Sequence, residues 1–68
     1  MPIGTVKWFN KTKGYGFIVP DGGDKDVFVH ITEVEKAGMQ GLNEGQRIAF
    51  GVTEAPRGLK AVDIRVSE

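Results

Sequence analysis

Apolar and polar residues alternate in five short segments of this chain, and clusters of turn residues separate the segments. A period of two places alternate side chains on opposite faces of a β-strand. No segment carries the longer period of a long amphipathic helix. The expected strands are Gly4–Asn10, Tyr15–Pro20, Asp26–Ile31, Arg47–Thr53 and Lys60–Val66.

The connections between these segments indicate how the strands are joined. Residues 21–25 form a dense turn cluster, which makes the second and third strands antiparallel neighbours. Residues 32–46 are a longer connection, in which Thr32 and Glu35 have capping-box spacing and Gly38 can end one or two helical turns. The pattern predicts an all-β fold, a small five-stranded antiparallel β-barrel of the OB type, with residues 1–68 as one domain.

The alternation also predicts which side of each strand is apolar. In the third strand Val27, Val29 and Ile31 share one face, and Phe28 and His30 share the other. In the last two strands the apolar face is expected to carry Ile48, Phe50, Val52, Val62, Ile64 and Val66, whereas Lys60, Asp63 and Arg65 are exposed.

Rings and a cation gather on the outward faces of the second and third strands. Lys13, Tyr15 and Phe17 share one face, and Phe28 and His30 continue it on the neighbouring strand. Exposed rings contribute little to folding, but they suit the stacking of unpaired bases beside a neutralised phosphate. The segment 13–19 also fits most of the RNA-binding signature Lys/Arg-Gly-aromatic-Gly-Phe.

Composition and charge change this interpretation only in part. The 68 residues include no cysteine, so a disulfide framework and a thiolate metal site are excluded. The net charge is zero, which by itself argues against a nucleic-acid partner. Residues 1–20 nevertheless contain three lysines and no acidic residue, so either one face is basic or the lysines cluster by chance.

The chain carries no pattern typical of an enzyme. It has no carboxylate pair beside a nucleophile, no set of metal ligands and no phosphate-binding loop, so we expect no catalytic residue, metal, cofactor or small-molecule substrate. The spacing of Asp21, Asp24 and Asp26 does not match a calcium loop and is typical of a turn. No secretory leader or membrane-spanning run is visible, which predicts a cytoplasmic protein without a membrane partner. We also expect the protein to be a monomer.

Three ordered motifs, Gly4–Asn10, Lys13–Ile18 and Asp26–Ile31, resemble those of bacterial cold-shock proteins, and the similarity continues through Leu42–Gln46. The resemblance implies a five-stranded barrel that binds single-stranded RNA and DNA. It also implies that the protein prevents or melts RNA secondary structure and modulates transcription and translation. The family's nucleic-acid-binding positions correspond to Lys7, Trp8, Phe9, Lys13, Tyr15, Phe17, Asp26, Phe28, His30 and Arg57.

For several residues the sequence allows two interpretations, a place in the interior or a place on the binding surface. Trp8 and Phe9 are adjacent, so strict alternation would bury one of them. Many relatives carry an aromatic residue where this chain has Ile31 and Met39, so these two residues either end the aromatic surface or pack in the interior. Lys60 is a further candidate for a phosphate contact. A small barrel with an aromatic groove also suits a protein partner, such as a proline-rich peptide.

Overall fold

Five strands and one short helix make up the described part of the protein. The computed structural model describes residues 2–23, 25–56 and 58–66. The elements are β1 (Ile3–Asn10), β2 (Tyr15–Pro20), β3 (Val27–His30), α1 (Ile31–Lys36), β4 (Arg47–Ala55) and β5 (Gly58–Val66). Each strand overlaps a segment that the alternation predicts, and β2 has the predicted bounds.

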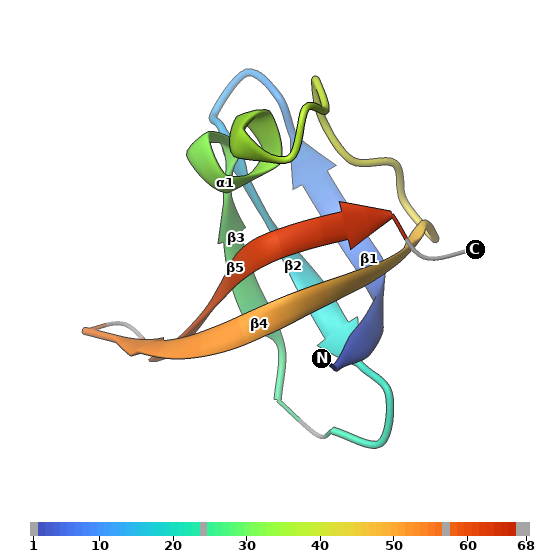
Figure 1. The fold of residues 1–68 in the computed structure, drawn as a ribbon, viewed down its shortest axis with the longest axis vertical. Coiled ribbons are helices and arrows are strands. Elements are labelled where there is room, and N and C mark those ends of the chain that lie inside the picture. Colours follow the sequence, from blue (N-terminus) through green and yellow to red (C-terminus); the bar gives the residue numbers. More distant parts are fainter. Residues whose placement is uncertain (1, 24, 57, 67–68) are drawn as a thin grey trace.

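The strands close into a ring in the order β1-β2-β3-β5-β4 (Figure 1). Four neighbouring pairs are antiparallel, but β3 and β5 are parallel. The prediction of an entirely antiparallel barrel is therefore wrong at this pair. Strand directions cannot alternate all the way around a closed ring with an odd number of strands, so at least one pair has to be parallel.

The side chains that point into the ring form an apolar core. The largest fully buried side chain is Phe50, and no buried side chain of the described residues is polar or charged. Burial of one such large apolar side chain stabilises the fold by about 1.5–3 kcal/mol. The buried residues are Val6, Ile18, Val27, Val29, Val34, Leu42, Ile48, Phe50, Ala61 and Ile64.

An irregularity in β5 interrupts the alternation there. Ala49 pairs with Arg65 and Gly51 pairs with Val62, so β5 contains one more residue than β4 between these two pairs. Asp63 lies in this stretch with a φ of +51°. An extra residue of this kind is a β-bulge, and it changes the face on which the following side chains lie.

The bulge explains why part of the predicted core is wrong. Ala61 and Ile64, three positions apart, are both buried. Val62 is only half buried, because the bulge places it on the opposite face from Ile64. Val66 shares the face of Ile64 but lies at the end of β5 and is 55% exposed, although the alternation predicted that both valines would be interior. Val52 on β4 is also exposed, at 41%, which departs from the apolar face predicted for that strand.

The helix α1 lies at one end of the ring (Figure 1) and begins two residues earlier than the capping-box spacing predicted. Its N-cap is His30, whose Nδ1 accepts a hydrogen bond from the backbone N–H of Thr32 at 3.2 Å. The buried side chain of Val34 packs the helix against the core. Gly38 follows the helix with a φ of +81°, in agreement with its predicted role at the C-terminus.

Across the described ranges of the chain, no helix combines the length and hydrophobicity needed to cross a bilayer.

Candidate nucleic-acid interface

One row of side chains crosses four neighbouring strands on the outside of the ring. Trp8 of β1 pairs with Phe17 of β2, and Phe17 pairs with Phe28 of β3. Phe28 in turn pairs with Lys60 of β5. Directly paired residues point to the same face of a sheet, so three rings and one lysine stand in line. A second row pairs Tyr15 with His30 beside the first.

We call the five rings of these two rows the aromatic platform: Trp8, Tyr15, Phe17, Phe28 and His30. Phe17 is central, with its ring centroid 5.3 Å from that of Trp8 and 5.9 Å from that of Phe28, both edge to face. Tyr15 lies 5.8 Å from Phe28 in a stacked arrangement, and His30 lies 6.3 Å from Phe28. Aromatic pairs of this geometry contribute about 0.5–1.5 kcal/mol each beyond burial, so the rings hold one another in place.

A bulge in β1 decides which of two adjacent rings joins the platform. Val6 pairs with Ile18, but the next paired residue is Trp8 with Phe17, so Lys7 is the extra residue. The alternation restarts after it: Val6 is buried, whereas Lys7 and Trp8 are both exposed. Trp8 is 37% exposed and belongs to the platform rather than to the core.

Phe9 lies on the other side of β1. It is half buried and packs against the core cluster rather than among the platform rings. Gly16 lies opposite Phe9, and a Cβ atom at Gly16 would be 2.3 Å from the Trp8 carbonyl oxygen and 2.7 Å from the Phe9 Cα. Only glycine allows the two backbones to approach this closely, and the approach places Trp8 against Phe17.

Two lysines of the predicted site lie near the platform. Lys13 is exposed, and its backbone N–H donates a hydrogen bond to Asn10 Oδ1 at 2.9 Å, which stabilises the turn before β2. Lys7 Nζ lies 3.0 Å from Asp26 Oδ2, so two predicted binding residues form an ion pair with each other. Their side chains are 54% and 38% exposed, and such a surface pair contributes at most about 1 kcal/mol.

The β4–β5 hairpin extends past β3 (Figure 1). Its residues Ala55, Pro56, Gly58 and Leu59 line pockets together with the platform rings Phe17 and Phe28, and we call these four residues the hairpin wall. Two neighbouring pockets, of about 510 Å³ and 600 Å³, lie against this wall. Both are lined by Phe17, Phe28, Ala55, Pro56, Gly58 and Leu59. The first, which we call the Lys60 pocket, is also lined by Tyr15, His30 and Lys60. The second, which we call the Asp26 pocket, is also lined by Lys25, Asp26 and Glu54.

Sequence reasoning missed the hairpin wall. Ala55, Pro56 and Leu59 reach the platform because β5 pairs with β3, and no motif in the chain signals that pairing. Arg57, a predicted binding residue, lies outside the described residues. The structure thus brings most of the predicted binding side chains to one surface. It also places the hairpin wall beside that surface.

Ile31 and Met39 pack against the core cluster as partly buried residues. This packing supports the interior reading of both positions. The Ile31 side chain also fills the space next to Gly14, where a Cβ atom would lie 3.0 Å from Ile31 Cγ2. The platform therefore has no ring at this end, and its rings are confined to β1, β2 and β3.

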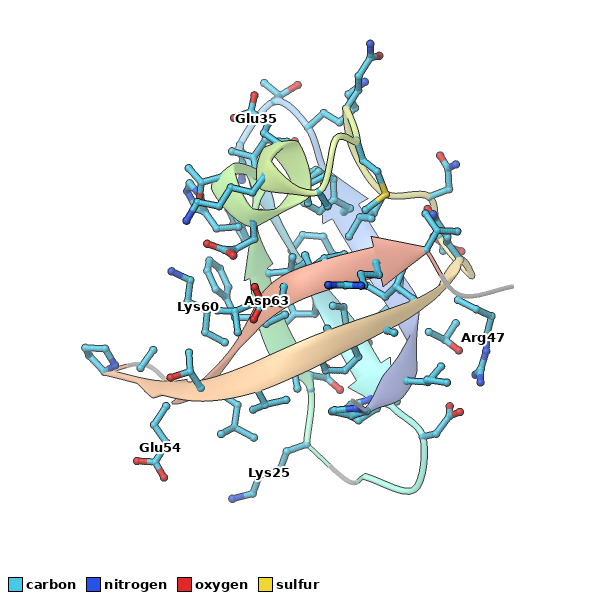
Figure 2. All side chains as sticks on the ribbon, in the orientation of Figure 1. Lys25, Glu35, Arg47, Glu54, Lys60 and Asp63 are labelled. Carbon is cyan, nitrogen blue, oxygen red and sulfur yellow. The ribbon has the colours of Figure 1, made fainter. Side chains whose placement is uncertain are left out.

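Asp21 takes part in an ion pair away from the platform. Its carboxylate accepts two hydrogen bonds from the Arg47 guanidinium, one of them at 2.8 Å from Nη1, and the hydrogen bonds lower the pKa of Asp21. Figure 2 shows Arg47 on the opposite side of the molecule from Lys60. Asp24 lies outside the described residues, and within the described ranges no three acidic or histidine side chains gather as a metal site.

Comparisons with known proteins identify the family of this chain. The family model of the 'Cold-shock' DNA-binding domain matches residues 3–67. "Probable cold shock protein A" of Mycolicibacterium smegmatis is 51% identical over 65 residues, which cover 96% of this chain and 97% of the relative. "Cold shock-like protein CspA" of Stigmatella aurantiaca is 51% identical over 65 residues, with 96% of both chains covered. "Cold shock protein CspA" of Rhizobium meliloti is 60% identical over 52 residues, or 76% of this chain and 75% of the relative. This protein therefore belongs to the cold-shock domain family.

Proposed function

We propose that this protein binds single-stranded RNA and DNA by stacking unpaired bases on the aromatic platform. The observation that carries the proposal is the row Trp8–Phe17–Phe28, whose rings are aligned across three strands and partly exposed. Base stacking on an aromatic side chain contributes about 1–3 kcal/mol per base. It tolerates different sequences because every base has a π-face, and a duplex hides those faces.

Lysines beside the platform supply the contacts to the backbone. Lys7 and Lys13 are exposed and lie on or next to the strands that carry the rings. A phosphate that approaches Lys7 competes with the carboxylate of Asp26, which the weak surface ion pair permits. The net charge of zero favours affinity from stacking over affinity from a broad basic surface.

Selective binding of unpaired bases shifts an RNA folding equilibrium toward the open strand. We therefore assign to the protein the role of an RNA chaperone, which prevents or melts secondary structure and thereby modulates transcription and translation. It acts as a monomeric binding module in the cytoplasm rather than as an enzyme. The open platform supports this assignment, since it binds a strand along its length and does not enclose a reacting group.

The test is a comparison of partners of equal length. A fluorescein-labelled heptathymidine, the matching duplex and a labelled proline-rich peptide are titrated with the protein, and binding is followed by fluorescence anisotropy. We expect the single strand to bind at least tenfold more tightly than the duplex, because only the single strand exposes base faces. Equal affinity for the single strand and the duplex would rule out stacking, and preferential capture of the peptide would support a protein-binding groove instead.

A further inference from the structure

Lys60 lies at the end of the row formed by Trp8, Phe17 and Phe28. The parallel pairing of β3 and β5 sets it directly beside Phe28, and its side chain lines the Lys60 pocket together with Tyr15, Phe17 and His30. Lys60 is half buried, whereas Lys25 in the neighbouring Asp26 pocket is exposed. Figure 2 shows Lys60 beside β5 and the β4–β5 hairpin, on the side away from Arg47. Lys60 is thus the cation that lines the same pocket as the Phe28 ring among the described residues.

The polar side chains of the Lys60 pocket are mostly hydrogen-bond donors. The Lys60 ammonium has three N–H groups and no acceptor, and it forms no ion pair with the residues that the structure describes. His30 Nδ1 accepts a hydrogen bond from the Thr32 backbone N–H, so a neutral ring carries its proton on Nε2 and donates from there. The Tyr15 hydroxyl can either donate or accept a hydrogen bond. Among the residues that the structure describes, no carboxylate side chain lines this pocket.

The neighbouring Asp26 pocket has a mixed character. It shares the Phe17 and Phe28 rings and the hairpin wall, and it contains one ammonium group, that of Lys25, together with the carboxylates of Asp26 and Glu54. Carboxylates accept hydrogen bonds and repel the acceptor atoms of a base edge. A base that presents acceptors is therefore favoured in the Lys60 pocket and disfavoured in the Asp26 pocket.

We propose that the Lys60 pocket is a guanine subsite and that Lys60 determines its specificity. The proposal rests on the proposed single-strand binding and deepens it. Guanine presents two adjacent acceptors, O6 and N7, and a lysine or arginine on this pair is the most frequent base-specific contact in nucleic-acid recognition. Adenine has an amino donor next to its N7 and cytosine has an amino donor at N4, so both place a donor against donors. Thymine presents only O4 on the corresponding edge.

In this subsite the base stacks on Phe28 and also contacts the apolar side chains of Pro56 and Leu59, which line the same pocket. The stem of Lys60 then runs along the base and its ammonium reaches the O6 and N7 edge. Specificity in this pocket comes from a side chain on β5, whereas the stacking surface comes from β1, β2 and β3.

The first experiment varies the base. Heptathymidine with a single central guanine is compared by anisotropy with the same strand carrying adenine, hypoxanthine or 7-deazaguanine. We expect the guanine strand to bind about five- to tenfold more tightly than the adenine strand, at the lower end of the discrimination of a two-acceptor contact. Hypoxanthine keeps O6 and N7 and should bind as guanine does, whereas 7-deazaguanine lacks N7 and should lose part of the preference.

The second experiment varies the protein. Lys60→Met keeps a long apolar stem and removes the ammonium, and it should reduce the ratio of guanine to adenine affinity to about one. Lys25→Met is the matched control, because it removes the same charge from the neighbouring pocket. It should weaken all strands by a similar factor and leave the ratio unchanged. Melting temperatures confirm that both variants are folded.

Three outcomes decide between the explanations. If Lys60→Met weakens the guanine and adenine strands by the same factor, Lys60 contacts a phosphate and the inference is wrong, although single-strand binding stands. If the native protein binds heptathymidine well but does not distinguish the four substituted strands, the subsite is also refuted. This comparison decides even if Lys60→Met fails to fold. If no single strand binds at all, the proposed function itself fails.

Discussion

Replacement of Phe17 by leucine separates stacking from folding at the centre of the aromatic platform. Phe17 pairs with Trp8 on one side and with Phe28 on the other, and it lines both pockets beside the hairpin. Leucine keeps most of the apolar volume but has no flat π-face. The change therefore removes a surface for bases while the strand and its pairing are retained.

The structure allows both expected effects to be estimated. Loss of one stacking ring weakens binding by about 1–3 kcal/mol, or roughly 5- to 150-fold in Kd. The two ring pairs of Phe17, at 5.3 Å and 5.9 Å, also support the fold. Because the ring is only half buried, we expect a loss of about 1 kcal/mol in the free energy of unfolding. A domain of this size then melts about 4–8 °C lower.

The assay measures both quantities on the same samples. Affinity for heptathymidine is obtained by anisotropy at a temperature where the variant is folded, and stability by thermal unfolding. Val19→Ala is the control, since Val19 lies on the same outer face of β2, is 39% exposed and lines neither pocket. It should change the affinity less than twofold.

Two results would refute this reasoning. A folded Phe17→Leu protein that binds heptathymidine as tightly as the native protein would show that bases do not stack on Phe17. A Phe17→Leu protein that is largely unfolded at 25 °C would show that the ring is part of the core and that its partial exposure has no role in binding.

Three further predictions concern the strand pairing at Gly16, the Asp21–Arg47 ion pair and the contribution of charge to binding. Gly16→Ala should prevent folding or lower the melting temperature severely, because the new Cβ would meet the backbone of Trp8 at 2.3 Å; circular dichroism measures this. Arg47 lowers the pKa of Asp21, so the stability from this pair is present above about pH 4 and is lost as pH falls through the lowered pKa; Asp21→Asn should remove that part of the acid dependence in pH-dependent unfolding. The slope of log affinity against log salt should lie between about −1.4 and −2.8, for two to four phosphates at about −0.7 each; a slope steeper than about −5 would contradict a stacking-dominated interface.

The sequence by itself determined the parts of this protein that depend on near neighbours along the chain. A period of two shows which residues share a face of a strand, so Tyr15 and Phe17 were predictable as one surface and Ile18 as interior. The turn at residues 21–25 joins β2 to β3 antiparallel, which extends that surface to Phe28 and His30. The existence of all five strands was predictable for the same reason.

Tertiary structure alone decided where the alternation is interrupted. The extra residue at Lys7 sends Trp8 to the platform and Phe9 toward the core, and the extra residue at Asp63 places Val62 and Ile64 on opposite faces of β5. A bulge exists only relative to the partner strand, because it consists of two residues opposite one. No pattern within a single segment can therefore reveal it.

Tertiary structure likewise decided how the platform ends. Lys60 and the hairpin wall reach Phe28 through the parallel pairing of β3 with β5, between residues that lie far apart along the chain. The odd number of strands requires one such parallel pair, but the position of that pair depends on how the ring closes. Side chains that share a strand are placed by local geometry, whereas side chains that meet across the closure are placed only when the whole barrel forms.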